Sequence, residues 1–133
     1  MTLRAVTPYL VIEGANAAID WYRDVLGAVE VARMVGGAGR VAHAELRIGP
    51  SVIFLGEEHP HLEDILAPPR IGGTPVYLDL ETDDVVGVFE RMVTAGATPI
   101  RLPTDPDLPL QTAKVRDPFG HIWLITRSVE ELA

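Results

Sequence analysis

Apolar and polar positions follow one another along this chain in two rounds of the same pattern. β-Branched and aromatic residues predict a strand from Thr7 to Glu13, and an apolar stripe at spacings of three and four predicts a helix from about Ala15 to Leu26. Gly27 stands where a helix ends in a left-handed residue. Glycine-rich turns separate three further expected strands, at about Val29–Met34, Arg40–Ile48 and Ser51–Gly56. Residues 1–56 are therefore expected to form one βαβββ module.

The pattern restarts after residues 57–73, which are rich in proline, glycine and charge and are expected to be a connector. A second module is expected over residues 74–133, within one structural domain overall. It begins with a strand over residues 74–81 and a helix from about Asp84 to Ala95, with Asp83 or Asp84 as the N-cap. The remaining strands are expected at about Thr98–Leu102, Gln111–Arg116 and His121–Arg127.

The two rounds correspond position by position, which indicates an internal duplication. Thr7-Pro8 matches Thr74-Pro75 at an offset of 67, and Gly27-Ala28 matches Gly96-Ala97 at an offset of 69. A repeat in which strand, helix and glycine all keep their register is typical of tandem copies of one structural unit. The sequence thus predicts an α+β fold.

Composition narrows the classes of function. The 133 residues include 47% hydrophobic residues and no cysteine, and the formal net charge is -8. Disulfides and thiolate metal sites are excluded, and the acidic balance argues against binding to nucleic acid or to anionic membranes. With neither a membrane-spanning apolar stretch nor a signal-peptide pattern, we expect a cytoplasmic protein.

The chain contains the segments TPYLV from Thr7, AIDWY from Ala18, LGA from Leu26, GGTPV from Gly72 and AGAT from Ala95. Together with two further segments, they resemble the glyoxalase/bleomycin-resistance superfamily, also called the vicinal oxygen chelate superfamily. The resemblance spans nearly the whole chain, and its His43-Ala44-Glu45-Leu46 and Asp117-Pro118-Phe119-Gly120-His121 segments point to the PhnB-like branch. It implies two tandem βαβββ modules with curled mixed sheets around a cleft, and a homodimer whose modules pair within or between chains.

Metal-dependent members of that superfamily, as the resemblance implies, place a histidine or glutamate on each of four strands. Here those positions hold Thr7, Phe54, Pro75 and Leu124, which lack carboxylate or imidazole donors. We therefore expect no metal and no other cofactor. The segment from Glu57 to His61 has donors at close spacing, and it is either an incidental surface metal site or a solvated polar loop.

Alternation along the strands proposes which side chains face the cleft that the resemblance implies. On the third strand Ala42, Ala44, Leu46 and Ile48 are expected against the helix, and Val41, His43, Glu45 and Arg47 toward the cleft. Val11, Thr112 and Thr126 are expected on the same lining. The residues predicted to bind a ligand are Tyr9, His43, Glu45, Phe54, Tyr77, Asp79, Lys114, Arg116 and Leu124.

Each of these polar residues also has a structural interpretation. The charged ones can form ion pairs across the strands, and His43 is either an acid/base group or ligand contact, or a strand histidine with its hydrogen bonds satisfied. Asp117 to Gly120 has the pattern of a tight turn, and His121 is expected to be structural, beside Trp123 and Ile125 on the helix-covered face.

Two classes of function fit this sequence. The first is a metal-free small-molecule binding protein resembling the bleomycin-resistance proteins, which would sequester an aromatic or antibiotic-like ligand. The second is an enzyme of the lyase, isomerase or dioxygenase type, which would use His43 as acid/base or a metal site that the motifs do not reveal. The sequence does not name the ligand.

Overall fold

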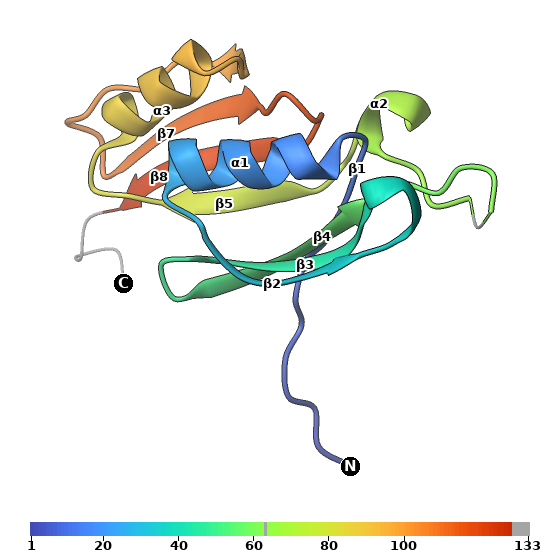
Figure 1. Cartoon of the computed structure of the whole chain (residues 1–133). Helices are drawn as coiled ribbons and strands as arrows, with labels where there is room; N and C mark the ends of the chain where they lie inside the picture. Colours follow the sequence, from blue (N-terminus) through green and yellow to red (C-terminus); the bar gives the residue numbers. More distant parts are fainter. Residues whose placement is uncertain (63, 129–133) are drawn as a thin grey trace. The chain divides into compact units, whose positions relative to one another are not determined.

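A computed structural model of the chain describes residues 1–62 and 64–128, and it divides into two compact units (Figure 1). The first unit runs to Arg70 and the second begins at Ile71. The predicted second module extends to residue 133, and its last five residues lie outside the described part. Each unit is a βαβββ module with one four-stranded mixed sheet, which confirms the predicted α+β fold class.

The first unit contains one sheet and one long helix. Its strands are hydrogen-bonded in the order β1-β4-β3-β2, with β1 parallel to β4 and the other pairs antiparallel. A short 3-10 turn, Gly37–Gly39, separates β2 from β3, and the helix α2 (Pro68–Ile71) lies at the unit boundary. The main elements are β1 (Tyr9–Ile12), α1 (Ala15–Leu26), β2 (Val29–Val35), β3 (Val41–Ile48) and β4 (Ser51–Glu57).

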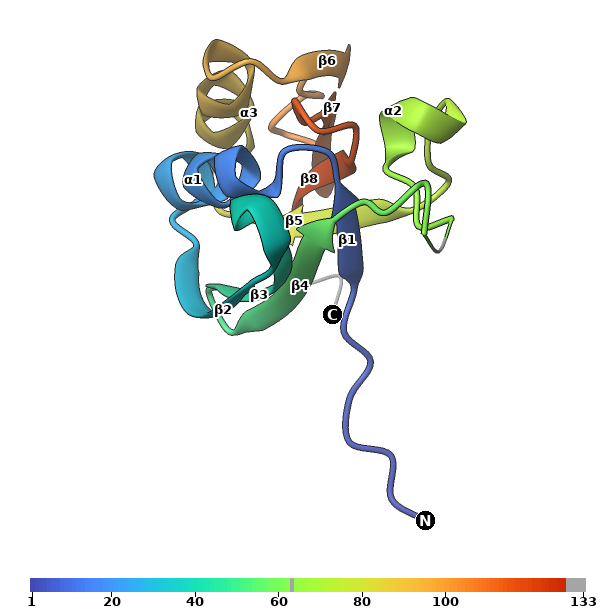
Figure 2. The same cartoon turned by 45° about the vertical axis from the view of Figure 1, so that its right-hand side comes forward.

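The second unit repeats this arrangement, with strand order β5-β8-β7-β6 and β5 parallel to β8. Figure 2 shows α3 beside the sheet of its own unit, as Figure 1 does for α1. The elements are β5 (Tyr77–Glu81), α3 (Val85–Thr94), β6 (Thr98–Arg101), β7 (Leu110–Arg116) and β8 (Ile122–Ser128).

In the first unit, α1 buries the stripe that its sequence predicts. The helix begins and ends at the predicted residues, and Gly27 adopts φ 68° at its C-terminus. There the Gly27 N–H donates to the Arg23 carbonyl, which satisfies an acceptor left free by the last turn. The buried set includes Ala15, Ala18, Ile19, Tyr22 and Val25 on α1, and Leu10, Ile12, Leu46, Ile53 and Leu55 on the sheet.

In the second unit, Asp84 is the N-cap of α3, and its carboxylate accepts the Gly87 N–H at 3.0 Å. Phe89 and Met92 on this helix are buried, as are Trp123 and Ile125 on β8. Alternation along β7 and β8 places their other face away from this core. The helix therefore fixes which side of the second sheet remains available to a ligand.

The turn from Asp117 to Gly120 has the structural role that its sequence predicts. Gly120 has φ 95°, and its N–H donates to the Asp117 carbonyl at 3.0 Å. His121 is half-buried, and its backbone N–H donates to the Asp117 carboxylate at 3.0 Å. This turn sets the register between β7 and β8, where Arg116 pairs with Ile122.

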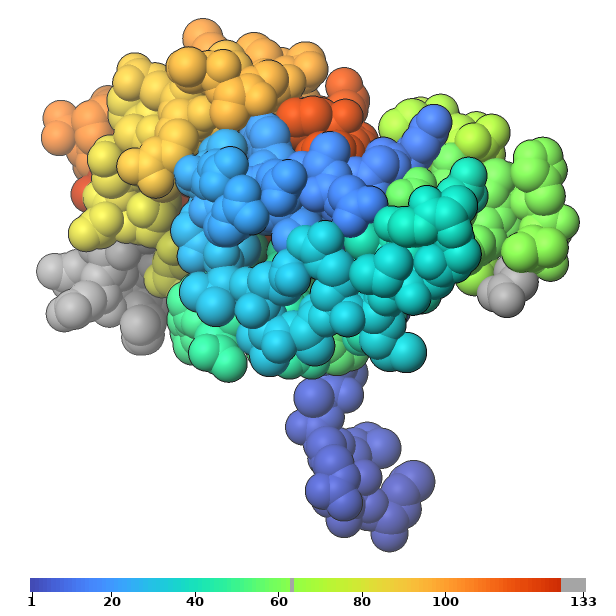
Figure 3. All heavy atoms as spheres, viewed as in Figure 1, coloured from blue at the N-terminus to red at the C-terminus, as the bar shows by residue number. Residues whose placement is uncertain are grey.

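The N-terminal residues before β1 are mostly exposed and extend away from the first unit as a blue tail in Figure 3. β1 and β5 both begin later than predicted, after Pro8 and Pro75, because proline has no N–H for a strand ladder. Among the described residues, no helix is both long and apolar enough to cross a membrane.

The alternation predicted for the start of β3 is wrong by one position. Val41, expected toward the ligand, is 0% exposed, whereas Ala42, expected against the helix, is exposed. The cause is an irregularity in the ladder between β2 and β3, where Met34 pairs with His43 but Val35 pairs with Val41. Ala42 is thus an extra residue on β3, and alternation resumes from His43 onward.

The expected connector has more structure than a solvated loop. β4 extends to Glu57, and His59 forms an antiparallel bridge with Ile65. Glu58 is only 3% exposed, and its carboxylate binds the Arg70 guanidinium, with the Glu58 Oε2 to Arg70 Nη2 distance at 2.7 Å. The interpretation of Glu57 to His61 as a solvated polar loop is therefore wrong for Glu58, because this carboxylate is buried and paired.

Candidate ligand-binding site

Three aromatic rings gather on the face of the first sheet that α1 does not cover. The ring centroids lie 5.4 Å apart for Tyr9 and His43, 4.9 Å for His43 and Phe54, and 6.2 Å for Tyr9 and Phe54. Tyr9 is 47% exposed, and the other two rings are half-buried. We call this group, Tyr9, His43 and Phe54, the aromatic face.

The strand ladders bring these three residues together. Tyr9 on β1 pairs with Phe54 on β4, and Phe54 in turn pairs with Glu45 on β3. His43 lies two residues before Glu45, so it projects from the same side of β3. The opposite side of these strands carries Leu10, Ala44 and Leu55, all buried. The helix-covered core therefore fixes the direction in which the aromatic face points.

The Tyr9 hydroxyl links this face to the irregular start of β3. Its oxygen lies 3.3 Å from the Ala42 carbonyl oxygen and 3.2 Å from Nδ1 of His43. Burial raises the pKa of the Tyr9 hydroxyl above its usual value, so the group keeps its proton and remains a hydrogen-bond donor. The two contacts hold the Tyr9 hydroxyl in place, and the Tyr9 side chain remains 47% exposed.

A pocket of about 410 Å³ adjoins the aromatic face. It shares Tyr9 and Ala42 with the features just described, and Val11 and Ile65 add apolar walls. Its polar side chains are those of Glu57 and His59, together with the hydroxyl-bearing ring of Tyr9. A volume in this range, with apolar and polar groups in similar measure on its walls, suits part of a small organic ligand.

Glu57 belongs to the wall of this pocket but is held by the helix. Its two carboxylate oxygens accept the N–H groups of Gly14 and Ala15, each at 2.9 Å, at the N-terminus of α1. The N-terminus of a helix has free N–H groups and a positive partial charge, and both favour a carboxylate there. Glu57 is thus committed to closing the helix.

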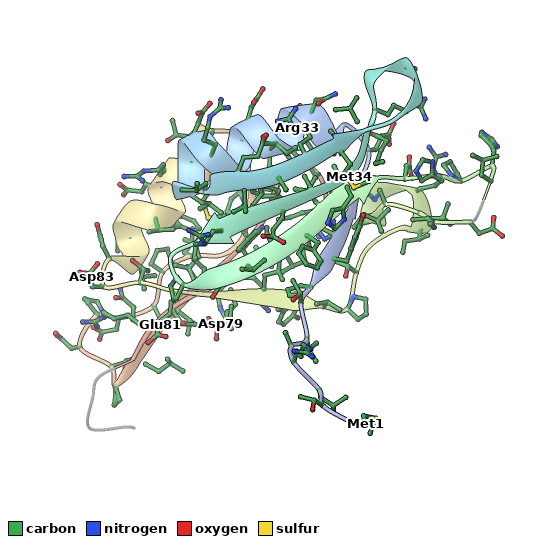
Figure 4. The ribbon with its side chains drawn as sticks, turned by 60° about the horizontal axis from the view of Figure 1, so that its bottom comes forward. Met1, Arg33, Met34, Asp79, Glu81 and Asp83 are labelled. Atoms are coloured by element: carbon green, nitrogen blue, oxygen red, sulfur yellow. The ribbon has the colours of Figure 1, made fainter. Side chains whose placement is uncertain are left out.

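At the opposite edge of the same sheet, the edge strand β2 makes polar contacts of its own. Figure 4 shows Arg33 near α1, where its guanidinium donates to the Asn16 side chain at 3.0 Å and pairs with Glu30. Met34, also labelled there, is the β2 residue that pairs with His43. Arg33 therefore ties the edge strand to the helix.

The second unit carries a corresponding set of predicted residues on the uncovered face of its sheet. Lys114 on β7 places its Nζ 4.2 Å from the ring centroid of Tyr77 on β5, a cation–π contact. Tyr77 is 53% exposed. The Lys114–Tyr77 pair thus presents an aromatic surface with a positive charge beside it.

The remaining predicted residues of this unit lie in register around the pair. Leu124 on β8 lies between Asp79 on β5 and Lys114 on β7. Figure 4 marks Asp79 on its strand, and its carboxylate accepts the Thr126 hydroxyl proton at 2.7 Å. Arg116 is exposed at the end of β7. The structure therefore brings Tyr77, Asp79, Lys114 and Leu124 together, and Arg116 lies at their margin.

The residues at the four family metal positions do not fit a metal. In the first unit, Thr7 precedes β1, and Phe54 presents a ring packed against Tyr9 and His43. In the second, Pro75 precedes β5 and Leu124 is apolar. Across residues 1–62 and 64–128, no three histidine, aspartate or glutamate side chains gather as metal ligands would. We therefore assign no role at this site to a metal ion.

Comparison with known proteins settles the family. The model of the glyoxalase/bleomycin resistance protein/dioxygenase superfamily matches residues 5–125. The chain belongs to this superfamily. A relative from Mycobacterium bovis, named an uncharacterised protein, is 36% identical over 130 residues, which cover 96% of this chain and 86% of the relative.

Solved structures of similar fold agree with membership of the superfamily. TioX from a Micromonospora species is 25% identical, with a TM-score of 0.69 over 95% of this chain and 97% of TioX. The PhnB protein from Bacillus cereus is 16% identical, with a TM-score of 0.69 over 94% of this chain and all of PhnB (100%). At this level of identity, the likeness to PhnB is a likeness of fold alone.

Two residues that shape the site, Ala42 and Gly56, are not predicted from the sequence. Alternation along β3 predicts Ala42 on the helix-covered side, and the sequence marks Gly56 only as the end of a strand. A Cβ on Gly56 would lie 2.8 Å from the Tyr9 hydroxyl oxygen and 2.8 Å from the Ala42 carbonyl oxygen. Gly56 has no left-handed φ, so the glycine was only a weak signal in the sequence.

Proposed function

We propose that this protein binds a small aromatic molecule on the aromatic face of its first unit, without a metal. The partly exposed cluster of Tyr9, His43 and Phe54, beside a pocket of about 410 Å³, carries the proposal. Aromatic side chains bury large areas and rarely gather at a surface unless something covers them. The superfamily that includes bleomycin resistance proteins gives this chain a precedent for binding of an antibiotic-like guest.

The charged groups near the aromatic face restrict the chemical class of the ligand. Glu45 lies beside Phe54 in the ladder, and the chain carries a net charge of -8. An aromatic molecule with a polar or cationic substituent matches this combination of rings and negative charge better than an anionic one. The Lys114–Tyr77 pair in the second unit is a second candidate contact surface, with the opposite charge.

Titration of an aromatic probe followed by NMR tests the proposal. Naphthol is expected to shift amide signals of β1, β3 and β4, and Phe54→Ala should weaken its binding about tenfold through loss of ring contact. Leu102→Ala is the matched control, because Leu102 is an exposed apolar residue on another part of the chain. Shifts that spread evenly over the surface, or equal affinity in Phe54→Ala, would contradict the proposal.

Native mass spectrometry tests the absence of metal and the oligomeric state together. We expect a homodimer that takes up no stoichiometric zinc, nickel or manganese and retains a co-purified organic mass. Support for the dimer comes from β2, an edge strand whose apolar residues Val29, Val31, Met34 and Val35 are exposed. One tightly bound metal per chain would contradict the metal-free proposal, and a monomer would contradict the dimer.

A second candidate function is acid/base catalysis by His43. The observation that favours it is the contact between Nδ1 of His43 and the Tyr9 hydroxyl, since an oriented imidazole can move a proton to or from a bound molecule. Replacement by alanine separates the two functions. Conversion of a substrate that His43→Ala abolishes, with binding unchanged, would favour the enzyme; retained function with loss only in Tyr9→Ala or Phe54→Ala would favour the binding protein.

A further inference from the structure

The Tyr9 hydroxyl has two hydrogen-bond partners and only one proton. Its oxygen lies 3.3 Å from the Ala42 carbonyl oxygen and 3.2 Å from Nδ1 of His43. A carbonyl oxygen can only accept a hydrogen bond, so both bonds form together only when the hydroxyl proton points to Ala42. The second bond then requires Nδ1 of His43 to donate its own proton to the Tyr9 oxygen. In a neutral imidazole, this leaves Nε2 with a free lone pair.

Gly56 provides the space in which this arrangement forms. A Cβ at this position would meet both the Tyr9 hydroxyl oxygen and the Ala42 carbonyl oxygen at 2.8 Å, closer than real Cβ contacts occur. One of these atoms is backbone and cannot move away cheaply. Gly56 is therefore needed here for space between β1 and β3, and an alanine would push the Tyr9 hydroxyl away from Ala42.

We propose that Tyr9 favours the Nδ1–H tautomer of the neutral form of His43, and that the ligand of the aromatic face donates a hydrogen bond to the Nε2 lone pair. The second part rests on the proposed function. Tyr9 and Gly56 are positioning residues, because they act through His43. The ligand class is then an aromatic molecule with an O–H or N–H group, since a ring without a donor leaves the Nε2 acceptor unpaired.

NMR of the ligand-free protein tests the first part. Long-range proton–nitrogen spectra distinguish the two ring nitrogens, and the spectrum of His43→Gln assigns the signals among the four histidines. We expect His43 in the Nδ1–H form, whereas a histidine exposed to water favours the opposite form. Tyr9→Phe and Gly56→Ala should both shift His43 toward Nε2–H. An Nε2–H signal in the wild type, or an unchanged Nδ1–H signal in Tyr9→Phe, overturns the proposal.

Gly36→Ala is the matched control for Gly56→Ala. Its nearest neighbours lie at 3.8 Å, an ordinary contact distance, so its His43 signals should match the wild type. If Gly56→Ala does not fold, Tyr9→Phe still decides, because it removes the hydroxyl and keeps the ring. If the tautomer population of His43 changes as much in Gly36→Ala as in Gly56→Ala, the proposed role of Gly56 is overturned.

A pair of probes tests the second part and separates it from the proposed function. Naphthol carries an O–H donor, and its methyl ether has the same rings without one. We expect wild-type protein to bind naphthol about fivefold more tightly, and His43→Phe to lose this preference. Equal binding of the two probes overturns the proposed hydrogen bond from the ligand to Nε2 of His43. It leaves the proposal of binding on the aromatic face standing. No binding of either probe overturns the proposed function, while the NMR result on His43 stands separately.

Discussion

The carboxylate of Asp117 accepts the indole N–H of Trp123 at 2.9 Å, six residues further along the chain. Its other oxygen accepts the backbone N–H groups of Phe119 and His121 at 2.9 and 3.0 Å. Asp117 and Trp123 are both buried, at 3% exposure each. One carboxylate thus fixes the turn between β7 and β8 and also anchors the largest side chain of β8.

Asp117→Ala is expected to destabilise the protein by about 3 kcal/mol, because it leaves buried donors without an acceptor. Urea denaturation measures the change. Trp123→Phe removes the indole donor, so the cost of Asp117→Ala should be about 1 kcal/mol smaller in that background. Equal costs in both backgrounds would mean that the bond to Trp123 contributes nothing, and that the turn alone needs Asp117.

Glu57 and Ala15 form a second contact between distant parts of the chain, and it closes the N-terminus of α1. Gly14, the N-cap residue, has no side chain to do so. Glu57→Ala should cost about 1–2 kcal/mol, as loss of a capping side chain does. Thermal unfolding measures it. Glu90→Gln on exposed α3 surface is the control and should stay within about 0.5 kcal/mol of the wild type.

The elements themselves were predictable because the information for them is local. An apolar stripe at helical spacing, followed by Gly27, sets the bounds of α1, and the duplicated pattern predicts where the strands of the described residues follow one another along the chain. The candidate residues of each sheet face followed from alternation wherever the ladder is regular. Tyr9, His43 and Phe54 share a face for this reason.

What the sequence could not predict depends on contacts between distant residues. The exchange of Val41 and Ala42 follows from the register of β3 against β2, which no alternation within β3 reveals. Glu57 meets the start of α1 across 43 residues, and Glu58 meets Arg70 across the expected connector. Gly56 matters because of two atoms on other strands, and its own backbone conformation is ordinary.

Gly27 tests the conformational requirement at the end of α1. Its φ of 68° is left-handed, and a Cβ there would have nothing within 4 Å, so strain alone decides the cost. Gly27→Ala should destabilise the protein by about 1–2 kcal/mol. Gly36→Ala, at φ -100°, should have almost no effect. Denaturant unfolding of the two variants measures the difference, and equal stabilities would contradict the argument from backbone conformation.

Glu58 gives the protein a dependence on acid pH with a definite sign. The hydrogen bond from Arg70 and the bond from the Ala67 N–H hold the pKa of this carboxyl at about 2, below its usual 4.5, against the opposing effect of burial. A group with a lowered pKa in the folded state stabilises the fold above the unfolded pKa. This contribution should decline as the pH falls from about 4.5 through about 2.

Glu58→Gln isolates this contribution from that of the other carboxylates. The variant should be less stable than the wild type at neutral pH, and the difference should shrink steadily between pH 4.5 and 2, because protonated Glu58 resembles glutamine. Denaturant unfolding at a series of pH values measures both curves. Arg70→Gln should flatten the dependence in the same way, since it removes the cation that lowers the pKa. A constant difference between wild type and Glu58→Gln over this range would show that Glu58 titrates normally in the folded protein.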